Sequence, residues 1–547
     1  MDYRFLLQNR KYSQDETFLI KRSCGHIRVC AAYANHYETA MSSLGFHYLY
    51  ETLNSHPQLS VERCYLPDNQ SIKLVLSKYL SSFETATPLV NFNIIAFSVS
   101  YESDFINVLR MLKLAKIPFK REERLTGGYP LLICGGPAAF QNIIAMHEIF
   151  DLFAVGSGEA TIGRFVEEYT GLAGSGRNPS EINFEIIRSL SGADNFFAPS
   201  ISGGAGDSKT VNCAWPENIK YARTVILTKN TEFRMRALVE TVRGCVRKCK
   251  FCMVGNCYGR FRHNGAADIE KYIDEVSPYT NKIGLLGPAV SAHPQIVEIY
   301  KRTRDKNLDI SMSSIYINEI GDELIKMLSE NEQKNITVAV ESACEEVRNL
   351  TAKKLSDADI FENLTRAVKC GIKNFKIYFI LGLYDYFGKN GDDEAGHTID
   401  FISSLNDRLL KQSREIKLKI SVNPLVIKPR TALFESMPES GAYREFYSSG
   451  DYIPVLEQRY KQIAKRLKAS NIEFSEKNFA DSALLKYINE CYVNLFDFFD
   501  DFFYNESKNS RSIVKIMQSR PDAFDARKVK KALFKADFRF GAARSGA

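Results

Sequence analysis

The stretch VRGCVRKCKFC, residues 242–252, places three cysteine thiols within eight positions of one another. An apolar run over residues 238–242 predicts a strand that leads into it, so Cys245, Cys249 and Cys252 stand in the loop that follows. Three thiolates so close in one loop can converge on a single metal centre. Loops at the carboxyl ends of parallel strands are also where α/β folds place their active sites.

Two kinds of metal centre use cysteines at short spacing. Structural zinc takes four closed ligands, usually as two separated pairs, and Cys257 or His263 could complete such a site here. A four-iron cluster held by three thiolates leaves one iron open, which is what chemistry at the metal requires. A single close group of three cysteines favours the iron–sulfur cluster, with zinc as the alternative.

Strand and helix patterns alternate around this loop. Six short apolar runs predict strands, at residues 238–242, 282–286, 309–313, 336–340, 375–381 and 417–422. Six βα units in a row predict a partial TIM barrel, (β/α)6, over residues 232–436. Residues 437–547 predict a C-terminal helical region, with helices over 452–470 and 480–503 and a basic tail over 527–544.

The first 171 residues, 1–171, show the same alternation. Apolar runs predict strands at residues 26–33, 61–66, 93–100, 130–134 and 150–155. Helical spacing separates some of them, at residues 38–53, 71–83 and 104–117. This order predicts an N-terminal doubly wound parallel sheet of Rossmann-like type. Residues 172–231, rich in Gly, Ser, Asn and Pro, predict a linker or wrapping segment.

Glycine pairs follow two of the predicted N-terminal strands. Gly135 and Gly136 follow one strand, and Gly156 and Gly158 follow the next. Ligands in doubly wound sheets bind beyond the carboxyl ends of the strands, where glycine lets the backbone approach a cofactor closely. Together the two pairs predict a cofactor-binding edge, whereas each pair alone would also suit a tight turn.

Composition and charge leave the substrate open. The chain is 45% hydrophobic and 25% charged, as ordinary globular proteins are. Its net charge of +7 does not by itself indicate a nucleic-acid partner, and the basic tail leaves RNA contact as an alternative. The N-terminus lacks the apolar core of a secretory signal, and no apolar run approaches the roughly 20 residues of a membrane-spanning helix. We expect a cytoplasmic protein with reduced cysteines.

The spacing Cys-x3-Cys-x2-Cys, with Phe251 before the last cysteine, resembles the signature of the radical S-adenosylmethionine (SAM) superfamily. The resemblance implies a [4Fe-4S] cluster on Cys245, Cys249 and Cys252. It implies an enzyme that cleaves SAM with one electron, giving methionine and a 5'-deoxyadenosyl radical. It also implies a reductant such as flavodoxin or ferredoxin as a partner.

The same resemblance implies SAM contacts outside the three cysteines. Phe251 would lie along the adenine, and Gly287 would help to hold SAM at the end of the second barrel strand. Glu341 and Ser342 would do so at the end of the fourth.

Two short motifs depart from the family pattern. Residues 287–289 are Gly-Pro-Ala, where many members have a Gly-Gly-Glu run for the amino group of SAM. Residues 382–384 are Gly-Leu-Tyr, where many have Gly-Leu-Pro after the fifth strand. These departures concern the predicted SAM contacts and not the three cysteines.

Five segments resemble the cobalamin (B12)-binding subgroup of this superfamily: residues 37–53, 134–159, 236–262, 336–385 and 422–434. In that subgroup a Rossmann-like cobalamin domain precedes the radical barrel. The resemblance therefore implies cobalamin as a further cofactor and methyl transfer to an unactivated carbon. The Asp-x-His-x-x-Gly motif of many cobalamin domains is absent here, as it often is in the subgroup, and Asn35-His36-Tyr37 follows the first strand.

Two alternatives to a cobalamin-dependent methyltransferase share some of its predicted features. A radical SAM enzyme with a non-cobalamin Rossmann domain would modify RNA or protein. A zinc-stabilised binding protein would use the cysteines without catalysis. No pattern in the chain names a catalytic residue or a substrate, because the fold alone does not specify either.

Overall fold

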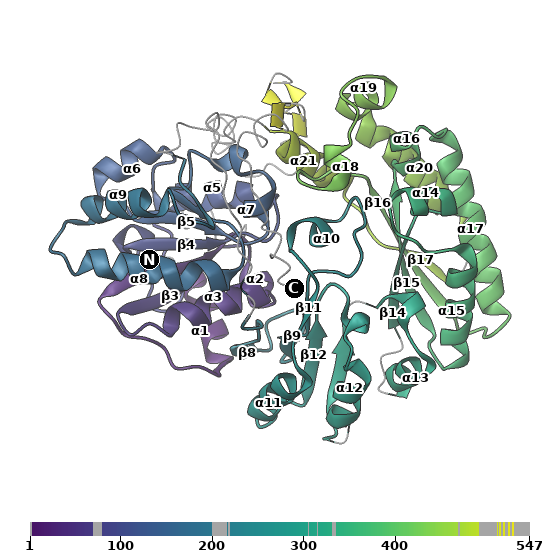
Figure 1. Ribbon diagram of the computed structural model, residues 1–547, viewed down its shortest axis with the longest axis horizontal. Helices are drawn as coiled ribbons and strands as arrows, with labels where there is room; N and C mark the ends of the chain where they lie inside the picture. Colours follow the sequence, from purple (N-terminus) through teal and green to yellow (C-terminus); the bar gives the residue numbers. More distant parts are fainter. Residues whose placement is uncertain are drawn as a thin grey trace, which may run out of the picture. The chain divides into compact units, whose positions relative to one another are not determined.

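The computed structural model describes residues 3–68, 79–199, 216, 219–304, 306–313, 315–330, 335–468, 471–491 and short segments between 511 and 529. The chain divides into two compact units. The first contains residues 1–237 and 487–547, and the second contains residues 238–486. Each unit has its own sheets, and Figure 1 labels many of their elements.

Five parallel strands and an antiparallel edge strand form the large sheet of the first unit (Figure 1). Their order across the sheet is β3 (Leu59–Tyr65), β2 (Ile27–Tyr33), β4 (Ile94–Ser98), β5 (Leu131–Gly135), β6 (Leu152–Ala154) and β7 (Phe196–Phe197). β2 pairs with both β3 and β4, so the direction of winding reverses beside it. The sheet is doubly wound, as the sequence predicts.

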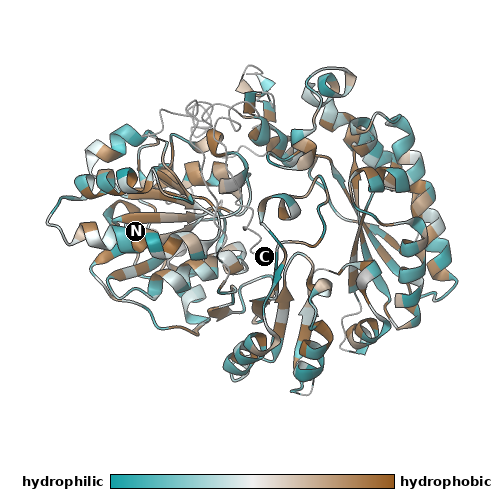
Figure 2. Ribbon diagram, viewed as in Figure 1, coloured by the Kyte–Doolittle hydropathy of each residue, from teal (hydrophilic) through white to brown (hydrophobic). Residues whose placement is uncertain are grey.

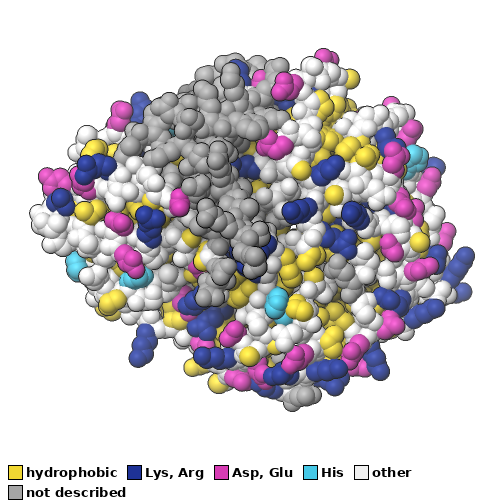
Figure 3. Space-filling view, in the orientation of Figure 1, with side chains coloured by type: hydrophobic (Ala, Val, Ile, Leu, Met, Phe, Trp, Pro, Cys, Tyr) yellow, Lys and Arg dark blue, Asp and Glu magenta, His cyan; other side chains and the backbone are white. Residues whose placement is uncertain are grey.

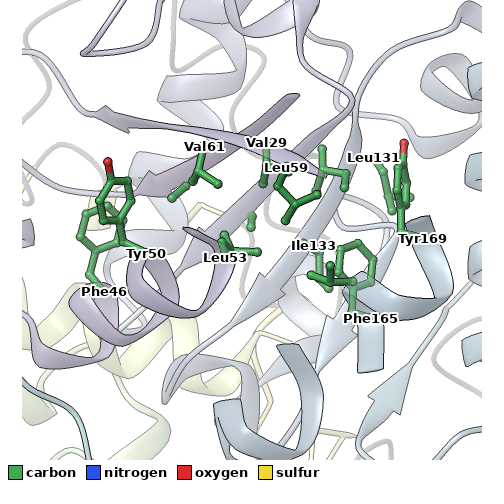
Figure 4. Close-up of a cluster of buried hydrophobic side chains, with 14 of the residues drawn as sticks. Val29, Phe46, Tyr50, Leu53, Leu59, Val61, Leu131, Ile133, Phe165 and Tyr169 are labelled. Carbon is green, nitrogen blue, oxygen red and sulfur yellow. The ribbon is translucent and has the colours of Figure 1, made fainter. Parts of the chain in front are cut away.

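The core of this unit lies between one face of the sheet and three helices, α3 (Leu44–Asn54), α8 (Gly158–Ala173) and α9 (Pro179–Leu190). Figure 4 shows Ile133 of the sheet beside Phe165 of α8, and Phe46 and Tyr50 together on α3. β4 is buried at all five positions, which explains why its sequence is apolar throughout instead of alternating. Hydrophobic residues correspondingly concentrate on the strands (Figure 2).

The helices of the first unit differ in part from the predicted ones. The expected helix over residues 38–53 is two helices, α2 (Tyr37–Ala40) and α3, because Ser43 starts a new helix. The Ser43 side chain accepts a hydrogen bond from the backbone N–H of Phe46, an N-terminal cap. Most of the expected helix over residues 71–83 lies outside the described residues, and residues 79–83 are not helical. Further helices are α1 (Tyr3–Gln14), α5 (Asp104–Ala115), α6 (Arg121–Gly127) and α7 (Ala138–Gln141).

Residues 172–231, expected to be a linker, contain regular structure. Asn178 and Glu181 form a capping box that starts α9, and Pro179 occupies its first position. β7 then extends the large sheet, and β8 (Ile226–Thr228) pairs with β1 (Glu16–Phe18). Helix α9 packs in the core, so this part of the segment belongs to the first unit.

Arg63 of β3 is fully buried and forms an ion network with two glutamates. Its Nη2 lies 2.7 Å from Oε2 of Glu16, and its Nε lies 2.6 Å from Oε1 of Glu84. The guanidinium carbon lies 4.7 Å from the ring centroid of Phe83 and 5.3 Å from that of Tyr50. The network connects β3 to β1. The buried charges of both glutamates are balanced by the single guanidinium of Arg63.

His47 of α3 is buried in its neutral form. Its Nδ1 accepts a hydrogen bond from the backbone N–H of Val225 at 3.3 Å, so its Nε2 carries the proton and donates to the carbonyl oxygen of Met41 at 3.0 Å. Burial lowers the pKa of His47 from 6.5 to about 4, since a second proton would be desolvated and would break the bond from Val225.

The neutral state of His47 predicts acid sensitivity of this unit. Its folded-state pKa lies below the ordinary value, so its contribution to stability is present above pH 6.5 and is lost as the pH falls toward about 4. We expect the urea midpoint of the wild type to fall across this window more steeply than that of His47→Gln. Far-UV circular dichroism at several pH values measures both. Equal slopes would contradict the assignment.

The second unit contains all six strands of the predicted partial barrel. They are β9 (Ala237–Glu240), β12 (Lys282–Leu286), β13 (Asp309–Met312), β14 (Asn335–Glu341), β15 (Asn374–Leu381) and β16 (Lys417–Pro424). Within the described residues they form two sheets, β13-β12-β9 and β14-β15-β16-β17, in which β17 (Ile472–Phe474) is a seventh strand at the edge. β14 pairs with β15, β15 with β16 and β16 with β17, each in parallel.

Helices alternate with these strands, as βα units require. They are α11 (Ala266–Val276), α12 (Ile296–Arg304), α13 (Asp322–Glu330), α14 (Glu345–Leu350), α15 (Asp357–Lys369), α16 (Leu383–Tyr386) and α17 (Asp392–Leu410). Beyond the last barrel strand follow α18 (Ala432–Glu435), α19 (Ala442–Ser448), α20 (Tyr452–Arg466) and α21 (Phe479–Glu490). α20 and α21 correspond to the two predicted C-terminal helices, and nearly all of the basic tail lies outside the described residues.

The described surface mixes charges of both signs. On the face that Figure 3 shows, Lys and Arg side chains are interspersed with Asp and Glu. Among the described helices, none combines the length and the apolar character that crossing a membrane would need.

Candidate active site

The three cysteines lie in a loop between a short strand, β10 (Val242–Arg243), and a short helix, α10 (Met253–Cys257). β10 pairs antiparallel with β11 (Arg262–His263), which anchors both ends of the loop. Gly244 has a φ of +74°, and a Cβ there would lie 2.7 Å from the carbonyl oxygen of Arg260. Glycine is therefore required where the chain turns into the cysteine loop.

Hydrogen bonds between side chains and the backbone hold the cysteine loop in shape. Asn256 of α10 donates through Nδ2 to the carbonyl oxygens of Cys249, at 3.1 Å, and Cys252, at 2.6 Å. The backbone N–H of Arg247 donates to Sγ of Cys245 at 3.4 Å. N–H donation to sulfur favours the thiolate, the form in which cysteine binds iron.

The donor set of this loop fits an iron–sulfur cluster. Cys249 is buried, whereas Cys245 and Cys252 are partly exposed, and none of the three is in a disulfide. Burial raises the pKa of Cys249, and the nearby ammonium of Lys353 opposes this rise. In the described part of the chain, no three or more His, Cys, Asp or Glu side chains lie close enough together to bind a single metal ion. A cluster accepts each thiolate on a different iron, so it does not need such convergence.

Gly287 lies just after β12, and the structure explains why it is glycine. A Cβ at this position would lie 2.4 Å from Cγ2 and 2.7 Å from the carbonyl oxygen of Val242, the residue that starts β10. The end of β12 thus packs directly against the strand that leads into the cysteine loop. A SAM contact at Gly287 stays a prediction.

Adding a methyl group at this position should disturb the cysteine loop from a distance. We expect Gly287→Ala to push β10 aside and to lower the iron bound per chain, with less 5'-deoxyadenosine formed. Colorimetric iron and sulfide analysis after anaerobic reconstitution measures the first effect. Gly321→Ala is the matched control, because a Cβ at Gly321 meets no atom within 4 Å. Equal iron contents in the two variants would refute this role.

The end of β14 carries a strained and buried carboxylate. Glu341 has a φ of +71°, which is uncommon for a residue with a side chain, and it is only 9% exposed. Such conformations persist where the surroundings enforce them, often at functional sites. Ser342 beside it accepts a hydrogen bond from the N–H of Cys344 at 3.3 Å, and its carbonyl accepts one from Arg348 at 2.7 Å.

Lys353 is a site residue that the sequence analysis missed. Its Nζ lies 3.3 Å from Oε1 of Glu341 and 5.1 Å from the ring centroid of Tyr316. Burial opposes the charge on Lys353, but Glu341, Tyr316 and Cys249 together raise the pKa of its ammonium. The Sγ of Cys249 lies 4.0 Å from the carbonyl oxygen of the preceding residue, Ala352.

Arg247 completes this group from within the cysteine loop. Its guanidinium carbon lies 4.0 Å from the ring centroid of Tyr316, and its Nη2 donates to Oδ1 of Asn318 at 3.2 Å. Its Nη1 donates to the carbonyl oxygen of Lys353 at 3.4 Å. The structure therefore brings Cys249, Glu341 and Lys353 together. Nothing in the local sequence of Lys353 marks it, because its contacts are with segments distant along the chain.

Phe251 lies within the cysteine loop, whereas Cys257 lies at the end of the helix α10 that follows it. Phe251 is half-buried in the loop itself. Cys257 is buried, with its Sγ 3.8 Å from Sδ of Met253 and 3.7 Å from the carbonyl oxygen of Arg430. Burial raises the pKa of the Cys257 thiol to about 12, so it is a packed thiol.

The end of β15 is held by buried polar contacts. Gly382 has a φ of +95°, and its N–H donates to Glu394 of α17 at 2.7 Å. Tyr384 donates through its N–H to the same carboxylate at 3.2 Å. Arg459 of α20 reaches Glu394 at 3.3 Å. The Gly-Leu-Tyr motif therefore forms a turn that buried hydrogen bonds to Glu394 hold in place.

The four predicted glycines of the first unit lie at the carboxyl ends of β5 and β6. Gly136 has a φ of +100°, and a Cβ there would lie 2.6 Å from the carbonyl oxygen of Val99. A Cβ at Gly158 would lie 2.7 Å from the ring of Tyr48, and Gly156 has a φ of +123°. The chain itself thus requires three of the four glycines.

The fourth glycine, Gly135, is not required by the packing of the chain, and polar groups lie at the neighbouring strand ends. A Cβ at Gly135 would meet no atom closer than 3.9 Å. His36 lies after β2 with its Nδ1 3.1 Å from the carbonyl oxygen of Leu66. Asp104 is buried with one carboxylate oxygen unbonded within the described residues, and burial raises its pKa to about 6.

Two protein-family models match this chain. The model described as "Radical SAM proteins, N-terminal" matches residues 45–199. The model described as "Radical SAM superfamily" matches residues 239–402, which include the three cysteines and Glu341. An uncharacterized protein of Methanocaldococcus jannaschii is 24% identical over 456 residues, covering 82% of this chain and 86% of that protein.

Comparison with solved structures gives matches of low sequence identity and low TM-score. SuiB of Streptococcus suis bound to S-adenosylmethionine is 14% identical with a TM-score of 0.30, over 66% of this chain and 70% of that chain. SuiB bound to the precursor peptide SuiA is 13% identical with a TM-score of 0.30, and the match spans 56% of each chain. Methylornithine synthase (PylB) is 12% identical with a TM-score of 0.28, over 54% of this chain and 84% of that chain.

Proposed function

This chain carries the N-terminal and core domains of the radical SAM superfamily, and from that premise we propose that it generates a 5'-deoxyadenosyl radical to modify a substrate carbon. The observation that carries the proposal is the loop of Cys245, Cys249 and Cys252 after the first barrel strand. Three thiolates would bind three irons of a [4Fe-4S] cluster and leave the fourth iron to SAM.

The residues around the loop suit the binding of SAM. When bound, the cluster supplies one electron to the sulfonium, whose sulfur–carbon bond breaks to give methionine and the 5'-deoxyadenosyl radical. Lys353 offers a buried ammonium to the carboxylate of SAM, and Glu341 offers a carboxylate to its ammonium or ribose hydroxyls. The ion pair with Glu341 favours the charged ammonium form of Lys353 in the buried site.

SAM cleavage is the direct test. Anaerobically reconstituted protein with dithionite should convert SAM to 5'-deoxyadenosine and methionine in equal amounts, as liquid chromatography with mass spectrometry would detect. Omitting the reductant is the control. Protein that incorporates iron and sulfide yet forms no 5'-deoxyadenosine would refute the proposal. Zinc in place of iron and sulfide would instead support the zinc-stabilised binding protein.

Flavodoxin or ferredoxin is the proposed electron donor. Val246, which is 49% exposed, and the exposed Lys248 lie in the cysteine loop itself. An apolar side chain beside a cation offers a contact to an acidic protein near the cluster. Reduced flavodoxin should therefore support SAM cleavage, more weakly at high salt.

The finer proposal is cobalamin-dependent methyl transfer. Its support is the doubly wound order of the first unit, together with Gly135 at the ligand edge, where a Cβ would make only ordinary contact with Ala154 at 3.9 Å. No described side chain besides His36 offers an imidazole at the end of β2. When bound, cobalamin would supply the methyl group, and the chain would hold the corrinoid through backbone groups of this edge.

Corrinoid binding tests this finer proposal separately. Protein incubated with hydroxocobalamin should keep a corrinoid absorption spectrum after desalting. Loss of the spectrum, with SAM cleavage intact, would exclude methyl transfer and favour a radical SAM enzyme that modifies RNA or protein. Salt-sensitive RNA binding would then support that alternative.

A further inference from the structure

The sheet of β14 to β17 has one face against helices and another lined by polar side chains. In β15 buried and partly exposed positions alternate along all eight residues. Phe379, at a buried position, contacts Phe401 of α17 with ring centroids 6.0 Å apart. Lys376 and Tyr378, at the alternate positions, therefore lie on the opposite face, which we call the inner face.

Parallel register aligns the polar side chains of the inner face in rows. Two rows lie at the amino ends of the strands: Thr337, Lys376, Lys419 and Glu473, and then Asn335, Asn374 and Lys417. Adjacent strands lie about 4.8 Å apart, so the side chains of neighbouring positions can contact one ligand group. These rows line a cavity of about 830 Å³, a volume typical of sites for small molecules.

The rows carry an excess of positive charge. Lys419 is paired with Glu473, Nζ to Oε1 2.9 Å. Lys376 and Lys417 form no ion pair within the part of the chain that the structure describes, and Lys376 lies 4.9 Å from the ring centroid of Tyr378. Two unpaired ammonium groups thus face the cavity beside neutral hydrogen-bond donors.

We infer that the inner face binds a phosphate group of the substrate. Two lysines match the charge of a phosphate ester, about −1.5 to −2 at pH 7, better than that of a single carboxylate. Lysine binds phosphate as a point charge, and the amides of Asn335 and Asn374 can donate to the remaining oxygens. No arginine lines the cavity to hold a carboxylate in bidentate fashion.

The position of the rows indicates the length of the substrate. This step rests on the proposed function, which places the reaction at the carboxyl ends of the strands. From Thr337 to Glu341 the chain of β14 advances four residues, about 13 Å at the rise of a strand. A substrate with its phosphate on Lys376 and Lys417 would extend along Tyr378 toward the reacting end. The substrate class is therefore an elongated, phosphorylated small molecule.

Pyrophosphate binding tests the site with the reconstituted full-length protein. Isothermal titration calorimetry should show salt-sensitive binding of inorganic pyrophosphate to the wild type. Lys376→Gln and Lys417→Gln should each weaken it by roughly tenfold. Lys461→Gln is the matched control, because Lys461 lies on α20, is 70% exposed and pairs with Glu457. No binding to the wild type, or equal weakening by Lys461→Gln, would overturn the inference.

The source of the phosphate is tested on the same protein. The dialysable fraction of a cell extract should stimulate 5'-deoxyadenosine formation, and prior phosphatase treatment of that fraction should remove the stimulation. Stimulation only by the non-dialysable fraction would overturn the assignment to a small molecule. Protein that binds pyrophosphate through the lysines but never cleaves SAM would refute the proposed function alone. SAM cleavage without lysine-dependent binding would refute the inference alone.

Discussion

Cys249→Ser is expected to abolish 5'-deoxyadenosine formation and to lower the iron bound per chain. A serine hydroxyl stays protonated near neutral pH and does not replace a thiolate as an iron ligand. Changes in groups that only support metal ligands cost roughly tenfold to a hundredfold in affinity or activity, so losing a ligand should cost more. Cys249 is also the most buried of the three thiols.

A neighbouring cysteine supplies the control for this experiment. Cys257→Ala removes a thiol close to the loop, whose contacts are with Met253 and the carbonyl of Arg430. It should keep the iron content and SAM cleavage of the wild type. A Cys249→Ser protein with full iron content and unchanged 5'-deoxyadenosine formation would show that the cluster is held elsewhere. Loss of iron in both variants would point to collapse of the loop.

Arg63→Met should produce the largest loss of stability, about 3–5 kcal/mol of unfolding free energy. The guanidinium is fully buried and is hydrogen-bonded to both Glu16 and Glu84. Removing it leaves two carboxylates in the interior without a counter-charge, and the desolvation cost of both remains. Denaturant unfolding followed by far-UV circular dichroism measures the change in unfolding free energy. Failure of the variant to accumulate as folded protein would also be consistent with a large loss of stability.

An exposed ion pair of the same unit is the control. Arg188 pairs with Glu185 at 2.7 Å, but its side chain is 66% exposed. Arg188→Met should cost no more than about 1 kcal/mol. Adding Glu16→Gln and Glu84→Gln to Arg63→Met should recover part of the loss, because the unpaired charges are then removed. Similar losses in Arg63→Met and Arg188→Met would contradict the role of the buried network.

Local patterns predicted the strands well because strands such as β4 are buried on both faces, and strands such as β15 alternate regularly between buried and partly exposed positions. The apolar run of β4 and the alternation of β15 are visible in the sequence, and all six barrel strands were found within the described residues. Helix ends were predicted less well. Ser43 interrupts an otherwise helical spacing, and the capping box of α9 lies among residues that otherwise indicate a loop.

Glycine shows where sequence interpretation reached its limit. Gly136 and Gly158 predicted a cofactor edge, yet Val99 and Tyr48 of the same chain approach them too closely for any side chain. The same holds for Gly287 beside Val242. A glycine needed for packing and a glycine needed for a ligand look alike in a single sequence, because the neighbour that excludes the side chain is distant along the chain.

Short spacings and local periodicity were enough to predict the three cysteines, their loop after a strand and the order of two α/β units. Tertiary structure alone decided that Lys353 pairs with Glu341 beside Cys249, and that Lys376 and Lys417 face one cavity. Charge pairing and burial arise between residues that only folding brings together, and no local pattern encodes them.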